Sequence, residues 1–298
     1  MISISQSLIT HLYFKGETIE VCPRNLYEVW IKKTHKLIPS DAMLYGQYGE
    51  TLCLGHTAYS SVTDLPRKEL NKKQQKQNQY NAIRGIPPVV GEKKIVQLRI
   101  EEQAVEFKRM QDSKEIEVYG TQVRLQMPLN DKYSLGGITD MFPYVHNNPD
   151  SGESLIGIGD LKFSDSLDNE RYDTKYPWKA FDIMDKTQGL VYLKLLRNLN
   201  NPMNKEVLST LPAKFLDLVY NMIFEYLVFE YGAKKRHRGF VVEWSDDKQR
   251  DIDETIRKVM ARLDYYEAHG WKAEPEINRC SECPIMNCNK RITAVVYG

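Results

Sequence analysis

The chain has 298 residues and a formal net charge of +1, with 42% hydrophobic and 27% charged residues. This composition can form a sizeable buried core and excludes a globally disordered chain. A nearly neutral charge provides no overall positive field, so any contact with nucleic acid depends on local basic patches. The sequence has no apolar run near about 18 residues and no basic N-terminal segment with a cleavage site. We therefore expect a cytoplasmic protein without a membrane span or a secretory signal.

The first half of the chain is predicted to be mainly helical. We expect helices in four segments, which are residues 5–14, 24–36, 41–53 and 92–112. Between the last two, residues 67–91 are polar, rich in Gln, Asn and Lys, and contain a Pro-Pro pair near their end. This pattern is typical of an exposed insertion that is partly helical.

The second half changes to a mixed pattern. Apolar and polar residues alternate as in strands, with turn-forming residues between them, over residues 115–128, 132–145 and 154–164. Further along we expect helices at 185–199, 212–230 and 246–269, and a buried strand at 238–244. The order predicts one α/β core without internal repeats, in which the first three strands are antiparallel.

Two carboxylates and a lysine fall on neighbouring predicted strands. Asp140 lies near the middle of one strand, and Asp160 and Lys162 lie near the end of the next. Because side chains alternate along a strand, Asp160 and Lys162 point to the same face, and hairpin pairing can bring Asp140 beside them. Charges on a half-buried face are costly unless they are compensated, and Mg²⁺ or Mn²⁺ suits such oxygen ligands.

The alternative is that Asp160 and Lys162 form a surface pair on an edge strand. An Asp-x-Lys sequence is common, but the apolar residues on both sides of it favour a functional site. The Gly-Ile-Gly sequence at 157–159 does not complete a nucleotide-binding loop, so we reject that interpretation.

Two other segments carry polar residues that need a partner. Glu50 follows Gly49 on an otherwise apolar helix, where it either serves a site or forms a local cap or pair. Gln188 and Tyr192 are four residues apart and share one helix face. Taken alone, they would be an ordinary surface residue and a core tyrosine.

The segments GQYGE, GGITD, GDLKF and QGLVY, in this order, resemble the motifs of RecB-type PD-(D/E)xK nucleases. The resemblance makes Lys162 a catalytic residue, with Gln188 and Tyr192 positioning the DNA strand. It implies a set of catalytic metal ligands, which are Glu50, Asp140, Asp160 and the backbone carbonyl of Leu161. His56 is a rival for the helix ligand but lies beyond the segment that fits, and glutamate at position 50 resembles phage-type members.

The resemblance implies an α/β, restriction-endonuclease-like core with a central mixed β-sheet flanked by helices. The expected activity is a Mg²⁺- or Mn²⁺-dependent deoxyribonuclease, an exonuclease or an enzyme that processes ends or single strands. It would act in recombination, repair, replication or CRISPR-type adaptation in a prokaryotic, phage or viral setting. DNA is the expected partner, and any helicase or recombination or adaptation protein would be a separate chain. The alternative is a non-catalytic nucleic-acid-binding protein with a structural four-cysteine metal site.

The cysteines are unevenly placed, with three of the five between positions 280 and 288. In an intracellular chain such spacing indicates metal ligation more readily than disulfides. One upstream and three terminal cysteines resemble AddB-like and CRISPR-adaptation nucleases, although the last gap is four residues here and usually five there. This resemblance implies a 4Fe–4S cluster, or alternatively a Zn²⁺ site, held by Cys22, Cys280, Cys283 and Cys288. Cys53 is expected to be a core residue.

The expected organisation has three parts. An N-terminal helical segment, 1–40, carries the first cluster cysteine. The nuclease core spans 41–270 and includes the polar insertion 67–91, and residues 271–298 form the C-terminal cysteine cluster. The sequence leaves the oligomeric state open.

Local basic and aromatic groups are further candidates for nucleic-acid contact. The alternative is that the basic groups are solvated surface and the aromatic groups are part of the core. Basic residues gather in two places, which are Arg67, Lys68, Lys72, Lys73 and Lys76 in the insertion and residues 234–238 further along. The aromatic residues that follow the catalytic strand could stack on unpaired bases or close the core, and they are Tyr172, Tyr176 and Trp178.

Overall fold

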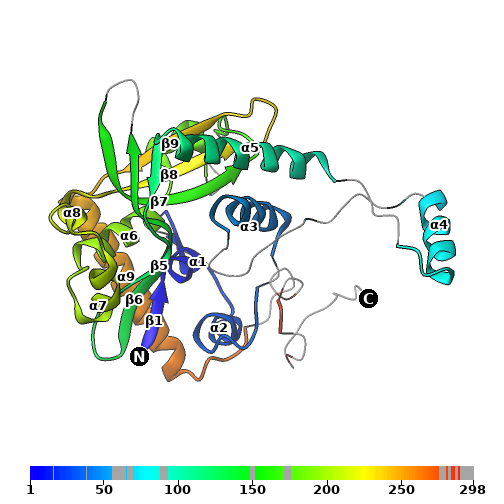
Figure 1. Cartoon of the computed structure of the whole chain (residues 1–298). Coiled ribbons are helices and arrows are strands. Elements are labelled where there is room, and N and C mark those ends of the chain that lie inside the picture. Colours follow the sequence, from blue (N-terminus) through cyan, green and yellow to red (C-terminus); the bar gives the residue numbers. More distant parts are fainter. Residues whose placement is uncertain are drawn as a thin grey trace.

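The computed structural model contains one central sheet with helices on both faces (Figure 1). It describes residues 1–15, 17–37, 39–55, 65, 70, 72–87, 93–147, 152–170, 176–274, 280, 283–285 and 288. Within these residues, no helix combines the length and the apolar character that crossing a membrane requires.

The sheet has seven strands and is mixed. Its path runs through β1 (Ile2–Ser5), β6 (Tyr133–Asn147), β7 (Ser154–Ser164), β8 (Ile223–Glu230) and β9 (His237–Val242). Two further strands pair with β6, and they are β4 (Ile116–Val118) and β5 (Thr121–Pro128). The pairs β1–β6 and β7–β8 are parallel and the others are antiparallel. The predicted α/β fold with a central mixed sheet between helices is confirmed.

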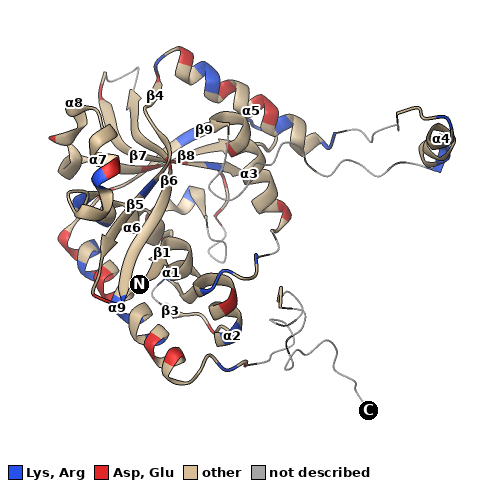
Figure 2. Ribbon diagram, turned by 60° about the horizontal axis from the view of Figure 1, so that its bottom comes forward, with Lys and Arg blue, Asp and Glu red and all other residues tan. Residues whose placement is uncertain are grey.

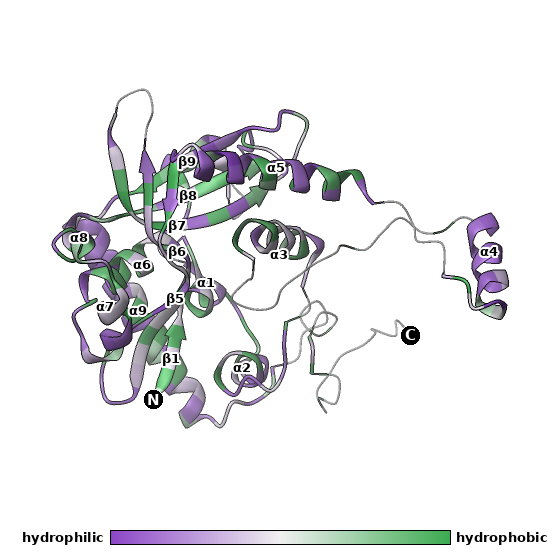
Figure 3. Cartoon of the chain, in the orientation of Figure 1, coloured by the Kyte–Doolittle hydropathy of each residue, from purple (hydrophilic) through white to green (hydrophobic). Residues whose placement is uncertain are grey.

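Two groups of helices cover the sheet. One face packs against α1 (Gln6–Leu12), α6 (Thr187–Arg197) and α9 (Asp246–Ala268), whose apolar residues share one large core with the sheet. The other face packs against α3 (Asp41–Leu54) and α5 (Ile95–Asp112), and there Phe107 and Met110 meet Leu161 and Phe229. Figure 3 shows hydrophobic colour concentrated in the strands and on the inner sides of these helices.

Short elements complete the described chain. They are β2 (Tyr13–Phe14), β3 (Glu17–Thr18), α2 (Pro23–Leu26), a π-helical turn (Tyr27–Ile31), α4 (Lys72–Ile83), α7 (Lys205–Thr210), α8 (Ala213–Leu216) and 3₁₀ turns at Trp178–Ile183, Pro202–Asn204 and Val219–Asn221. The α4 helix lies apart from the sheet and its covering helices in both Figure 1 and Figure 2.

The prediction of a helix over residues 212–230 was wrong. Its first half contains α8 and a short 3₁₀ turn, and its second half is β8, a strand between β7 and β9. Every residue of β8 after Ile223 is buried because helices cover both faces of the sheet there. A strand buried on both faces is a continuous apolar run without alternation, so periodicity cannot distinguish it from a buried helix. The short β1 strand was also not predicted.

Candidate active site

The candidate site lies where β6 and β7 separate. Their pairing ends with Met141 opposite Gly159, and beyond this point β7 continues its parallel pairing with β8. The next backbone N–H of β7 that faces β6, that of Leu161, donates to Oδ2 of Asp140 at 2.9 Å. A carboxylate thus replaces a backbone partner at the fork, which holds Asp140 against β7.

Asp160 is the buried acid of the site, with 4% of its surface exposed. Its Oδ1 accepts a hydrogen bond from Nε2 of Gln188 on α6 at 2.8 Å. Its Oδ2 forms an ion pair with the Lys162 ammonium and receives no hydrogen bond from any other described residue. Strand alternation therefore places Asp160 and Lys162 side by side on the face that α6 covers, as expected.

Glu50 reaches the fork from α3. Nε2 of Gln122 donates to Oε1 of Glu50 at 3.0 Å, and the carboxyl groups of Glu50 and Asp140 lie close enough for each to influence the pKa of the other. Gln122 lies on β5 opposite Asp140, since its two neighbours pair with Met141 and Thr139. The structure therefore directs Glu50 to the same site as the two aspartates. His56, the rival ligand, lies outside the described residues.

The electrostatics of the site favour protonated carboxyl groups. Burial raises the pKa of Glu50 to about 7, although Lys162 and Gln122 act in the opposite direction. Burial and the nearby carboxylates of Asp160 and Glu50 raise the pKa of Asp140 well above its ordinary value. Burial alone would lower the pKa of Lys162, but Asp160 outweighs this and raises it, so the ammonium stays charged.

The fit of a divalent ion can be judged from these contacts. Among the described residues, no three acidic, histidine or cysteine side chains are grouped so that they could hold a metal ion as they stand. Asp160 pairs with Lys162, while Glu50 accepts a hydrogen bond from Gln122, so the predicted ligand set of Glu50, Asp140 and Asp160 stays a prediction. The donor chemistry does fit, since two adjacent buried carboxyls repel each other when ionised and a cation would relieve this repulsion.

A glycine allows α3 to bring Glu50 this close. A Cβ atom at Gly49 would lie 2.4 Å from the ring of Phe163 on β7, so α3 can rest against the sheet only without a side chain there. Gly46, one turn earlier on the same helix, has no atom within 4 Å of the corresponding position. Close packing of α3 on β7 therefore requires glycine at position 49 but not at position 46, although both residues lie in the GQYGE segment.

We expect Gly49→Ala to displace α3 and to separate Glu50 from Asp140. Overpacking of this kind costs about 1–3 kcal/mol of unfolding free energy. Gly46→Ala is the matched control and should be neutral or stabilising by up to about 1 kcal/mol, because alanine is the better helix former. Urea unfolding of both variants measures the difference, and equal stabilities would contradict the close packing of α3 on β7.

The two α6 residues that were expected to position DNA contact the protein itself. Gln188 is 7% exposed and holds Asp160, as described above. Tyr192 is 3% exposed, and its hydroxyl donates to the backbone carbonyl of Ile138 on β6 at 2.6 Å. Gly137 leaves room for this ring, since a Cβ atom there would lie 2.6 Å from it. Both side chains thus fix the site, and direct contact with DNA stays a prediction, as does the role of the Leu161 carbonyl.

The aromatic residues after β7 were expected either to stack on unpaired bases or to close the core. Trp178 is buried and packs against Tyr226 and Phe240, so it closes the core and does not stack on bases. Tyr176 is half-buried, stacks on Trp178 and donates from its hydroxyl to Oε1 of Gln188 at 3.2 Å. Tyr172 lies outside the described residues.

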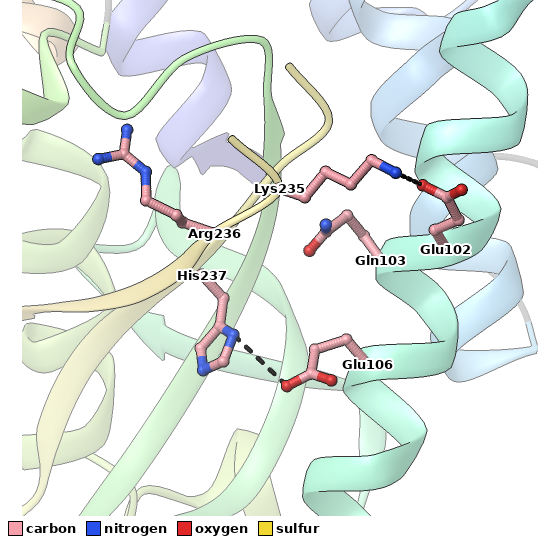
Figure 4. Close-up of a pocket in the computed structure, with 6 residues that line it drawn as sticks. All are labelled: Glu102, Gln103, Glu106, Lys235, Arg236 and His237. Carbon is pink, nitrogen blue, oxygen red and sulfur yellow. Dashed lines mark ion pairs between the residues drawn. The ribbon is translucent and has the colours of Figure 1, made fainter. Parts of the chain in front are cut away.

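The basic segment at 234–238 is balanced by acidic side chains. Figure 4 shows a pocket between α5 and the chain that leads into β9, where Lys235 pairs with Glu102 at 2.6 Å and His237 approaches Glu106 at 3.7 Å. Lys234 pairs in turn with Asp168 at 2.6 Å. This part of the chain therefore carries little uncompensated positive charge.

The structure shows contacts of Cys283 and of Cys53. Asn25, on α2 directly after Cys22, donates from Nδ2 to Sγ of Cys283 at 3.2 Å. This contact joins the two ends of the chain across 258 positions. Cys53 packs against the core on the α5 side, and burial raises the pKa of its thiol, as expected for a core residue. Grouping of all four predicted cluster cysteines is not seen among the described residues.

The chain matches no protein-family model and no curated protein. Among solved structures, it is similar to a crystal structure of a "putative exonuclease" from Eubacterium rectale, with a TM-score of 0.55 and 16% sequence identity. The alignment covers 99% of this chain and 91% of that chain. At this identity the likeness concerns the fold, and it extends over the helices as well as the sheet.

Two residues of the site were missed in the sequence. Gln122 lies in a predicted strand, where nothing in the alternating pattern sets it apart from its neighbours. Tyr176 was considered as a base-stacking or core residue, and its contact with Gln188 was not predicted. Both contact other site residues through long-range folding, and the sequence contains no local signal for such contacts.

Proposed function

We propose that this protein is a Mg²⁺- or Mn²⁺-dependent nuclease that hydrolyses phosphodiester bonds of DNA, as an exonuclease or an end-processing enzyme. The observation that carries the proposal is the meeting of Asp140, Asp160 and Lys162 at the fork of β6 and β7, with Glu50 directed to the same place. The fold similarity to the Eubacterium rectale protein, which is described as a "putative exonuclease", agrees with it.

Each side chain has a distinct task in the proposed reaction. Glu50, Asp140 and Asp160, with the Leu161 carbonyl, would hold the ion, which when bound would polarise the phosphate and activate a water molecule. The Lys162 ammonium would stabilise negative charge that develops on the phosphate oxygens. Gln188 orients Asp160 through their 2.8 Å hydrogen bond. Without an ion, the pKa of Glu50 is about 7, so near neutral pH its carboxyl would give up the proton when it takes up the ion.

The test is an assay on end-labelled single- and double-stranded DNA with Mg²⁺, Mn²⁺ or EDTA. We expect cleavage with at least one of the two metals and none in EDTA. An absence of cleavage under every condition, together with tight DNA binding, would instead favour the non-catalytic nucleic-acid-binding protein. We also propose that the nuclease acts in recombination, repair, replication or adaptation. A helicase or adaptation protein would then be a separate chain.

We also propose that Cys22, Cys280, Cys283 and Cys288 hold a 4Fe–4S cluster, with Zn²⁺ as the alternative. The contact between Asn25 and Cys283 supports it, because it brings one of the C-terminal cysteines to the helix that begins after Cys22. Four thiolates are a suitable ligand set for either centre, and such a centre would join the chain ends to the core.

Cys22→Ser should lower the melting temperature and the iron content of anaerobically purified protein. One ligand fewer weakens the centre, whose binding stabilises the fold. The wild type should contain about four iron atoms and four sulfides per chain if the cluster is 4Fe–4S. Cys53→Ser is the control and should keep its iron. Iron-free and zinc-free wild-type protein that melts like Cys22→Ser would exclude the centre.

A further inference from the structure

The α4 helix and the four residues after it carry positive charge and contain no acidic residue. Residues 72–87 contain three lysines and one arginine and no Asp or Glu. No ion pair joins Lys72, Lys73, Lys76 or Arg84 to an acid among the described residues, in contrast to the paired basic segment at 234–238. Uncompensated charge of this kind attracts an anionic partner.

The positive residues are arranged along one side of the helix. Lys72, Lys76 and Tyr80 are spaced by four residues, so they lie on one face about 6 Å apart along the axis. Arg84 follows at the same spacing, and its guanidinium lies 4.4 Å from the centre of the Tyr80 ring. Tyr80 is 47% exposed. The result is a row of cations that includes one exposed aromatic ring.

The helix lies apart from the body but its segment begins beside the site. In Figure 2, α4 stands away from the sheet and shows its lysines in blue. The segment that contains it starts after α3, which ends at Leu54, one turn beyond Glu50. It returns to the core at α5, the helix that packs beside α3. A ligand held along α4 would therefore be tethered to the elements that carry Glu50.

We propose that α4 is a second DNA-binding element, which contacts the phosphate backbone outside the active site. This inference rests on the proposed nuclease function for the choice of DNA. The lysine ammonium groups can contact phosphates, and the exposed Tyr80 ring offers a stacking surface for a base. The helix has few apolar side chains to bury, and therefore it lacks the apolar centre of a protein–protein interface.

The expected size of the effect follows from counterion release. Each phosphate contact contributes about 0.9 to the slope of log affinity against log salt for duplex DNA and about 0.7 for single strands. Loss of three contacts should reduce the slope by about 2–3. Between about 50 and 200 mM salt, the wild type should then lose about 20- to 40-fold more affinity than a variant without the lysines.

The test compares two variants with equal loss of charge. Lys72→Gln, Lys73→Gln and Lys76→Gln are combined in one variant. Lys248→Gln, Arg250→Gln and Lys258→Gln on α9 form the control, and two of these are already paired with Asp247 and Glu254. Fluorescence anisotropy with labelled single- and double-stranded DNA in EDTA gives affinity and salt slope without cleavage. Circular dichroism and the three single substitutions, each with about a third of the effect, show that the loss does not come from unfolding.

We expect the α4 variant to bind DNA at least about tenfold more weakly at low salt with a reduced slope, and the control to bind within a small factor of the wild type. Equal affinity and slope for the wild type and both variants would overturn the inference, whether or not the protein cleaves DNA. If no cleavage is found with any metal but the α4 variant alone loses DNA binding, the inference stands and the nuclease proposal fails.

Discussion

Replacing Asp160 with Asn, or Lys162 with Met, is expected to reduce the rate of DNA cleavage by a factor on the order of 10²–10³ or more. Asn keeps the size of Asp160 and its contact with Gln188 but removes the charge that would bind the ion. Met removes the ammonium that would face the phosphate. Single-turnover cleavage with saturating enzyme measures the chemical step, so a change in DNA affinity does not obscure the effect.

Asp165→Asn is the control for these variants. Asp165 lies just beyond β7 and is exposed, so its replacement removes a nearby charge without touching the fork. We expect it to cleave within a few-fold of the wild type, and all variants to bind DNA in EDTA. Cleavage by Asp160→Asn or Lys162→Met at a similar rate to that of Asp165→Asn would remove this site from consideration.

In the absence of metal, we expect Glu50→Gln to make the folded protein more stable than the wild type. The folded pKa of Glu50 is about 7 and its ordinary value is 4.5. Between these values the unfolded chain releases a proton that the folded chain keeps, so wild-type stability falls as the pH rises through this range and is constant above it. Gln stays neutral and avoids the loss, which amounts to about 3 kcal/mol for a difference of about 2.5 between the two pKa values.

Urea unfolding in EDTA at several pH values measures this difference. The two proteins should be equally stable near pH 4.5, the ordinary pKa, and the variant should gain stability up to pH 7 or 8. Glu106→Gln is a control of opposite sign, because a hydrogen bond from Arg109 lowers the pKa of Glu106. A Glu50→Gln protein less stable than the wild type at pH 8 would show that the carboxyl is ionised without cost.

Addition of Mn²⁺ should reverse the order. An ion that binds the folded protein stabilises it according to its concentration and affinity, and Glu50 is one of the proposed ligands. We expect the melting temperature of the wild type at pH 8 to rise with Mn²⁺ and that of Glu50→Gln to change much less. An equal rise in both proteins would place the ion elsewhere. This readout does not depend on cleavage activity.

The sequence was sufficient to predict the sheet strands that carry the site. Alternation of side chains put Asp160 and Lys162 on one face, and the turn between the two strands put Asp140 near them. These are short-range consequences of strand geometry. Only the family resemblance predicted that the helix with Glu50 would pack near the two aspartates. A helical pattern does not indicate which strand the helix will contact.

Other features depend on burial that arises only in the folded chain. β8 was mistaken for a helix because both of its faces are covered. The hydroxyl of Tyr192 was expected near DNA, yet its carbonyl partner on β6 is 54 positions away in the sequence. The ion pair between Asp160 and Lys162 and the hydrogen bond from Gln122 to Glu50 also depend on distances that spacing does not determine.

Gln122 combines an unfavourable backbone conformation with a useful side chain. Its φ of 55° is in the left-handed region, which costs a residue with a side chain about 1–2 kcal/mol. Glycine would adopt this conformation freely but could not reach Glu50, to which the glutamine amide donates at 3.0 Å. The protein thus tolerates a conformational cost at the position that orients Glu50. A variant library screened only for heat resistance should therefore select glycine at this position, and the enriched sequences should be those that orient Glu50 least well.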